Sequence, residues 1–144
     1  MNDAVLFDAR EDGIAIITLN RPDARNALGK EIRAGWFAAW ERFEHDASLR
    51  VAILTGTGDK AFCAGGDLKE MMELQLKVPP LDMFPVPGDN IRLSKPTIAA
   101  VNGAAMGVGL GIALASDIVW AADNAKFSSP FASLGVALDS GGHF

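Results

Sequence analysis

The sequence contains little cysteine and little histidine. Its 144 residues include one cysteine, Cys63, which has no second thiol for an intramolecular disulfide, and two histidines. One thiol and two imidazoles fall short of a convincing zinc-ligand set. We therefore expect a reduced, metal-free protein of the cytoplasm, and we interpret Cys63 as a small buried hydrophobe.

Basic residues are outnumbered by acidic ones. Thirteen Lys and Arg against eighteen Asp and Glu give a net charge of −5 and an isoelectric point near 4.9. Proteins that bind nucleic acid normally carry a basic face or stripe. We therefore expect no nucleic-acid partner, although a small cationic patch for a few phosphates stays open.

The sequence also lacks a secretion signal and an uninterrupted apolar run. The first residues, MNDAVLFDAREDG, carry acids where a signal peptide has a basic segment followed by an apolar one. The 21 uncharged residues from Pro96 to Ser116 are long enough to cross a bilayer, but a proline, an asparagine and four glycines interrupt them. We expect neither secretion nor a membrane span.

The remaining composition is typical of a globular domain. Hydrophobic residues make up 49% of the chain and charged residues 22%, well away from the composition of disordered proteins. A length of 144 residues corresponds to about one domain and suffices for a packed interior. We therefore treat residues 1–144 as one core domain.

Hydrophobic periodicity predicts an α/β chain. Five short apolar segments are predicted strands, namely Val5–Phe7, Ile14–Leu19, Val51–Thr55, Thr97–Val101 and Asp117–Ala121. Three segments are predicted helices, namely Gly29–His45, Asp67–Leu74 and Gly107–Ala115. Asp67 is the expected N-cap of the second helix. An aromatic stripe on the first helix indicates a face that packs in the core.

The stretch from Lys77 to Ser94 has no such pattern. Four prolines fall within nine residues there, which excludes a helix interior and a central strand. Long irregular segments inside compact domains are often functional, so this one is a candidate for covering a ligand.

Two glycine-rich turns, Ala61–Met71 and Val101–Ile118, each follow a predicted strand and precede a predicted helix. Such a turn can present backbone N–H groups to an anion or a developing oxyanion, although its glycines can also serve only tight turns and close packing. The second turn does not fit a dinucleotide fingerprint, because Ile112 stands where the third glycine of G-x-G-x-x-G is required. A phosphate-binding Gly-Lys-Ser/Thr motif and a G-x-S-x-G motif are absent from the sequence.

Four segments together resemble the crotonase superfamily, also called the enoyl-CoA hydratase/isomerase family. They are ITLNRPDARNAL at 17–28, VAILTGTGDKAFCAGGDLKEM at 51–71, KPTIAAVNGAAMGVGLGIALASDIVWAADNAKF at 95–127 and LGVALDSGG at 134–142. The resemblance implies an α/β crotonase-like fold of repeated ββα units around a spiral core. It also implies acyl-CoA substrates, trimers or pairs of trimers, and an oxyanion hole made by the N–H groups of Gly66 and Val108.

The resemblance also implies a binding site for coenzyme A, which enters as part of the substrate, with no separate cofactor. Residues expected to line that site are Ala24, Leu28, Ala64, Gly65 and Asp67. Residues that could supply positive charge for its phosphates are Arg21, Arg25 and Lys30, although they could equally form an ordinary solvated surface.

The sequence departs from the family at the catalytic carboxylates. Two glutamates position water and exchange protons in the hydratases, and the resemblance aligns them with Gly111 and Phe131, neither of which transfers a proton. Asp139 stands where some isomerases and a dehalogenase of the family carry a working aspartate, although Leu138–Gly142 also suits a plain turn. We expect Asp139 to be the catalytic acid/base group.

A second departure is length, because family members are nearly twice as long. We expect the N-terminal part of the fold, truncated before the C-terminal helices, with apolar surface left for them or for another chain to cover. The expected activity is double-bond isomerisation or a related proton transfer on an acyl-CoA. The alternatives are a non-catalytic acyl-CoA-binding or assembly module and a hydratase by family name only.

Overall fold

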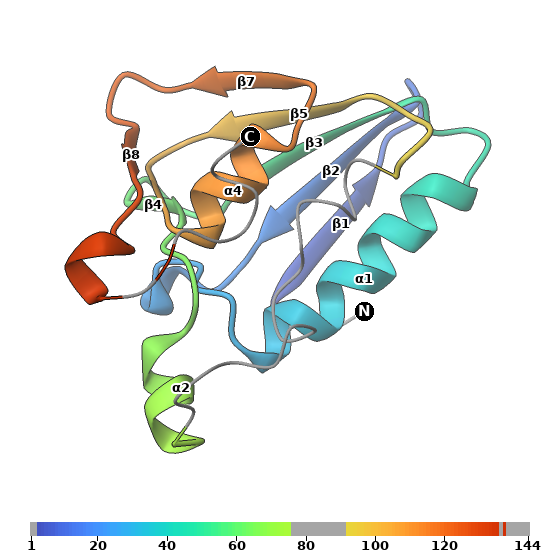
Figure 1. Ribbon diagram of the computed structural model, residues 1–144. Coiled ribbons are helices and arrows are strands. Elements are labelled where there is room, and N and C mark those ends of the chain that lie inside the picture. Colours follow the sequence, from blue (N-terminus) through green and yellow to red (C-terminus); the bar gives the residue numbers. More distant parts are fainter. Residues whose placement is uncertain (1–2, 76–91, 136, 138–144) are drawn as a thin grey trace.

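A computed structural model describes residues 3–75, 92–135 and 137 of the chain, which form two sheets and three α-helices (Figure 1). The larger sheet has five strands in the order β1 (Val5–Ala9), β2 (Ile14–Leu19), β3 (Val51–Gly56), β5 (Thr97–Val101) and β7 (Ile118–Ala121). The smaller sheet has three strands in the order β4 (Ala61–Cys63), β6 (Ala104–Met106) and β8 (Lys126–Ser128). The helices are α1 (Lys30–His45), α2 (Leu68–Glu73) and α4 (Val108–Leu114), with 3-10 turns at Pro22–Ala24 and Ala132–Leu134.

The chain repeats a ββα unit, as the resemblance predicts. Strands β1 and β2 form an antiparallel hairpin in the larger sheet, and α1 follows them. Each later repeat has one strand in the larger sheet followed by one in the smaller sheet. The pair β3 and β4 precedes α2, the pair β5 and β6 precedes α4, and the pair β7 and β8 precedes the last 3-10 turn. All later pairings are parallel, so successive connections leave both sheets at their carboxyl ends.

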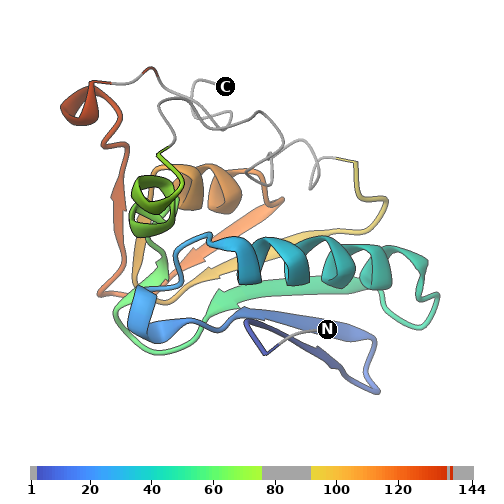
Figure 2. The same ribbon diagram turned by 90° about the horizontal axis from the view of Figure 1, so that it is seen from below.

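The core lies between α1 and the larger sheet. Figure 2 shows α1 lying along one face of that sheet. The aromatic stripe on α1 is buried, and the rings of Trp36 and Trp40 pack edge to face with centroids 5.5 Å apart. On β2 every second residue is fully buried, which is the period-two pattern of a strand with one face on the core. The predicted core role of the aromatic stripe is therefore confirmed.

The sequence patterns identified the larger sheet and missed the smaller one. Strands β2 and β5 begin and end where predicted, and β1 extends two residues beyond Phe7, to Ala9. The strands β4, β6 and β8 have three residues each, too few for an alternating pattern to register. Two of them also lie in the glycine-rich segments, whose composition favours turns.

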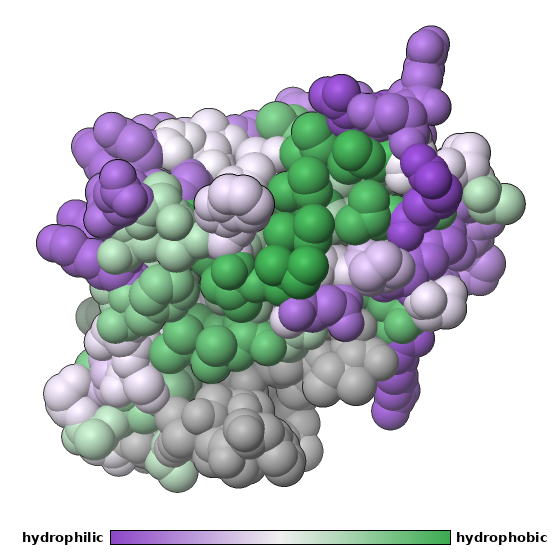
Figure 3. All heavy atoms as spheres, turned by 90° about the horizontal axis from the view of Figure 1, so that it is seen from above, coloured by the Kyte–Doolittle hydropathy of each residue, from purple (hydrophilic) through white to green (hydrophobic). Residues whose placement is uncertain are grey.

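Apolar side chains are exposed along β7, the edge strand of the larger sheet. All four of its residues are exposed, with Trp120 at 75% and Ile118 at 55%, and Leu114 at the end of α4 is 58% exposed. Figure 3 shows apolar surface gathered on this side of the molecule. Exposed apolar surface was expected from the short chain. In the described residues no helix is both long enough and apolar enough to cross a membrane.

Candidate active site

The two glycine-rich turns meet at one end of the smaller sheet. Strands β4 and β6 pair in parallel, with Ala61 opposite Ala104, so the turns that follow them leave from the same edge. A Cβ atom added to Gly65 would lie 2.9 Å from the carbonyl oxygen of Met106 and 4.0 Å from the backbone nitrogen of Val108. The structure therefore brings the first turn, Ala64–Asp67, against the start of α4.

Glycine is required at three points of this arrangement. Gly65 has φ +95° and Gly107 has φ +53°, values in the left-handed region that side chains disfavour. A Cβ atom on Gly109 would lie 2.8 Å from Cβ of Cys63, so α4 packs directly on β4 only because position 109 has no side chain. These glycines fix how closely the first turn of α4 approaches the Ala64–Asp67 turn.

Two backbone donors at this junction are available. Val108 is the first residue of α4, and the N–H groups of a first helical turn have no partner within the helix. The preceding Gly107 donates its N–H to the carbonyl oxygen of Ser128 at 3.0 Å, which fixes the turn. Among the hydrogen bonds between described residues, none uses the N–H of Gly66 or of Val108. Both N–H groups can thus donate to a bound oxygen.

The segment expected to contact coenzyme A runs beside the first turn. The N–H of Ala64 donates to the carbonyl oxygen of Arg25 at 3.1 Å, and the N–H of Leu28 donates to that of Gly65 at 2.8 Å. The side chain of Leu28 is fully buried in the core, whereas Ala24 is partly exposed and Arg25 is exposed. The structure thus brings the expected binding residues together. Leu28 contacts the turn through its backbone, because its side chain is buried in the core.

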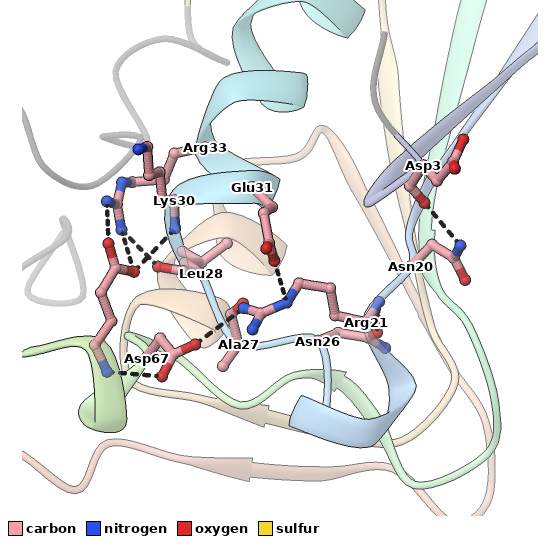
Figure 4. A network of polar contacts seen from close by, with 11 residues as sticks. Asp3, Asn20, Arg21, Asn26, Ala27, Leu28, Lys30, Glu31, Arg33 and Asp67 are labelled. Carbon is pink, nitrogen blue, oxygen red and sulfur yellow. Dashed lines mark hydrogen bonds and ion pairs between the residues drawn. The ribbon is translucent and has the colours of Figure 1, made fainter. Parts of the chain in front are cut away.

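The side chains of Arg21 and Asp67 form an ion pair. Arg21 pairs with Asp67 at 2.9 Å and with Glu31 at 3.0 Å (Figure 4). Asp67 also caps α2 by accepting a hydrogen bond from the N–H of Glu70, as predicted. Burial alone would raise the pKa of Asp67, but the hydrogen bonds from Arg21 and Glu70 outweigh it and hold this pKa below its usual value. The charge on Arg21 is therefore balanced within the protein.

The other two basic residues expected near the site, Arg25 and Lys30, differ from Arg21. Among the described residues no ion pair involves Arg25 or Lys30. Arg25 also lines a cavity of about 150 Å³ between the first 3-10 turn and the loop from Thr57 to Ala61. Unlike Arg21, these two side chains therefore have no carboxylate partner among the described residues.

Sequence reasoning missed Asn26, which organises this loop. Its side chain is buried and accepts a hydrogen bond from the N–H of Arg21 at 2.9 Å. Its amide nitrogen donates to the carbonyl oxygens of Ala61 at 2.8 Å and Thr57 at 3.1 Å. Asn26 itself has φ +56°, a conformation that asparagine tolerates better than most residues. In the sequence Asn26 stands between Arg25 and Ala27, and no local pattern marks it as an organising residue.

A family model and several known proteins match most of this chain. The family model described as Enoyl-CoA hydratase/isomerase matches residues 9–144. The chain belongs to the enoyl-CoA hydratase/isomerase family. It is 38% identical over 99% of its length to YngF of Bacillus subtilis, which carries the same description, and 44% identical over 92% to carnitinyl-CoA dehydratase of Escherichia coli K12. These matches span 56% and 51% of the two relatives.

A solved structure of the family shares the fold. The crystal structure of enoyl-CoA hydratase from Bacillus anthracis superposes with a TM-score of 0.86 at 30% identity, covering 97% of this chain and 55% of that one. The chain has the crotonase fold over the part it contains, and it spans about half the length of its relatives.

Gly111 and Phe131, where the resemblance in sequence places the family's two glutamates, carry no carboxylate. Gly111 is buried within α4. The ring of Phe131 lies beside the second turn, since a Cβ atom on Gly107 would be 3.7 Å from its Cζ atom. Asp139 and most of the Lys77–Ser94 stretch lie outside the described residues, and so do the expectations placed on them.

Cys63 takes no part in this chemistry. Its side chain is fully buried, and burial raises the pKa of the thiol to about 12. The interpretation of Cys63 as a buried hydrophobe is confirmed. Within the ranges 3–75 and 92–135, no group of three or more His, Cys, Asp or Glu side chains is arranged to hold a metal ion.

Proposed function

We propose that this chain forms the part of an acyl-CoA enzyme that binds the thioester and polarises its carbonyl group. The N–H groups of Gly66 and Val108 are the proposed donors to the carbonyl oxygen. The observation that supports this proposal is that the two glycine turns meet at the carboxyl ends of β4 and β6. Neither N–H group donates a hydrogen bond to another described residue. Each such donor is worth about 10² to 10³ in rate.

The proposed reaction is a double-bond isomerisation or a related proton transfer. A base removes a proton from the carbon next to the thioester carbonyl, and the C–H electron pair moves into that carbonyl as an enolate. The two N–H groups stabilise the negative oxygen. The substrate carries a double bond between the second and third carbons from the carbonyl, and return of the proton at that third carbon re-forms the carbonyl and leaves the double bond between the first and second carbons. Asp139 is the proposed proton carrier, on the resemblance in sequence.

A second candidate reaction is the addition or loss of water. The identity of 44% to a carnitinyl-CoA dehydratase favours it. Against it stand Gly111 and Phe131, which cannot position water or exchange its protons as two glutamates do. A third candidate, a non-catalytic acyl-CoA-binding or assembly module, differs from both because it predicts binding without turnover.

We also propose a cytoplasmic location and assembly into trimers or pairs of trimers. The exposed apolar side chains of β7 support burial against another chain or against a further segment of the same protein.

The first expected result is that the protein binds CoA thioesters. Titration calorimetry with acetyl-CoA and with a long-chain acyl-CoA measures this directly. Arg25→Gln should weaken binding of both ligands to a similar extent, because the proposed contact is to the phosphates they share. Failure of a folded sample to bind either thioester would contradict the proposal.

The second expected result is that hydration of crotonyl-CoA is very slow or absent. The reason is the lack of a carboxylate at Gly111 and Phe131. Loss of the enoyl-thioester absorbance follows the reaction, with bound crotonyl-CoA verified separately by calorimetry. A turnover of about 1 to 10³ per second, the ordinary enzymatic range, would show that water addition is the main activity.

A further inference from the structure

The donor Gly66 lies in a turn that has little rigidity of its own. Gly65 and Gly66 are consecutive glycines, and glycine is the residue with the most backbone freedom. An oxyanion donor is effective only when it is held in place before the charge develops. Upstream, the hydrogen bonds from Leu28 to Gly65 and from Ala64 to Arg25 provide that restraint. Downstream, the chain enters α2.

Among the described residues, no fully buried apolar side chain holds α2. The helix has six residues and none of them is buried. Leu68 is 59% exposed and Met72 is 79% exposed. Figure 1 shows α2 projecting away from both sheets. A helix of this length is marginal by itself, so its position depends on specific contacts.

Those contacts are ion pairs with the start of α1. Glu70 accepts hydrogen bonds from both terminal nitrogens of Arg33, at 2.8 and 3.2 Å, and one from the N–H of Lys30 at 2.9 Å. Arg33 also donates to the carbonyl oxygen of Leu28 at 3.0 Å, in the segment that binds the Gly65 carbonyl. The Arg21–Asp67 pair adds a second restraint directly after Gly66 (Figure 4).

Their burial makes these pairs stronger than ordinary surface pairs. The side chains of Arg33 and Glu70 are 17% and 19% exposed, and an arginine that binds both carboxylate oxygens fixes orientation as well as distance. The hydrogen bonds from Arg33 hold the pKa of Glu70 below its usual value. By contrast, the Lys69–Glu73 pair on the same helix spans 3.9 Å with both side chains largely exposed.

We propose that Arg33 and Glu70 are positioning residues for the oxyanion hole: their ion pair clamps α2 to α1 and so fixes the N–H of Gly66. The proposal rests on the proposed function. It goes beyond that function because neither side chain is among the proposed thioester-binding groups, and because it assigns a catalytic consequence to a contact between two helices.

The test uses the full natural protein and an infrared readout that does not depend on turnover. Acetyl-CoA labelled with ¹³C at the thioester carbonyl serves as the probe, because hydrogen bonds to a carbonyl oxygen lower its stretching frequency. Glu70→Gln keeps the size of the side chain and removes the ion pair. Glu73→Gln is the matched control, since it removes an exposed pair from the same helix.

The wild-type protein and Glu73→Gln should lower the carbonyl frequency equally. Glu70→Gln should lose part of that lowering, since the N–H of Val108 still donates, and should slow α-proton exchange of butyryl-CoA by about 10- to 10²-fold, with thioester affinity within about threefold of wild type. Glu70→Asp keeps the charge and should recover part of both effects. It also serves as the second variant if Glu70→Gln melts below the assay temperature.

Two results would overturn the proposal in different ways. If Glu70→Gln lowers the melting temperature but leaves the carbonyl frequency and the exchange rate unchanged, the pair is structural only. If the wild-type protein binds the labelled thioester without lowering its frequency, the oxyanion hole itself is wrong, and the positioning role falls with it.

Discussion

Replacing Val108 by proline is expected to slow α-proton exchange of a bound acyl-CoA by about 10² to 10³, the usual loss when one oxyanion donor is removed. Proline has no N–H, so the substitution deletes the proposed donor itself. Val108 is the first residue of α4, the helical position where proline is tolerated best. The helix should therefore form, and thioester affinity should change little.

Val108→Ala is the matched control, because it shortens the same side chain and keeps the N–H. Val108 is 5% exposed, so both variants lose side-chain contacts and both should melt somewhat lower than wild type. Only the proline variant should lose rate. Rates close to wild type in both variants would remove the N–H of Val108 from the oxyanion hole. Equal and large losses would show that the side chain of Val108, and not its N–H, carries the effect.

The sequence predicted the larger sheet because its strands are long enough to show their pattern. Ile14–Leu19 and Thr97–Val101 carry β-branched and apolar residues between turn signals, and both have the predicted bounds. The strand Ala104–Met106 begins with two alanines and stands between an Asn-Gly pair and a glycine-rich turn, so local composition indicates a turn. Its strand character comes from pairing with β4 and β8, which are distant in sequence.

The candidate site was predictable as two turns but not as one junction. Each glycine turn was visible in the sequence, and the resemblance indicated Gly66 and Val108. Their proximity depends on the parallel pairing of β4 with β6, two strands that the patterns missed. Arg21 shows the same limit, because only the folded chain brings it to Asp67, a residue far along the sequence. Local patterns identify donors and charges, whereas tertiary pairing decides which of them meet.

Replacing Asp139 by asparagine is expected to lower turnover by about 10² to 10⁴, the usual contribution of general acid–base catalysis. Asparagine keeps the size of the side chain and its tendency to form turns, but it cannot accept the proton that an enolate mechanism removes. Affinity for the thioester should stay nearly unchanged, because Asp139 is not among the residues proposed to contact coenzyme A, such as Arg25 and Lys30. Calorimetry and α-proton exchange on the same sample separate the two quantities.

Asp123→Asn is the control for Asp139→Asn, since Asp123 is an exposed aspartate between β7 and β8 and its loss should leave the exchange rate unchanged. The comparison belongs in the full natural protein, because relatives are about twice as long and their remaining length can carry other acids. If Asp139→Asn exchanges α-protons as fast as wild type, Asp139 is a turn residue. The proton carrier then lies elsewhere, and the two backbone donors would still polarise the carbonyl for it.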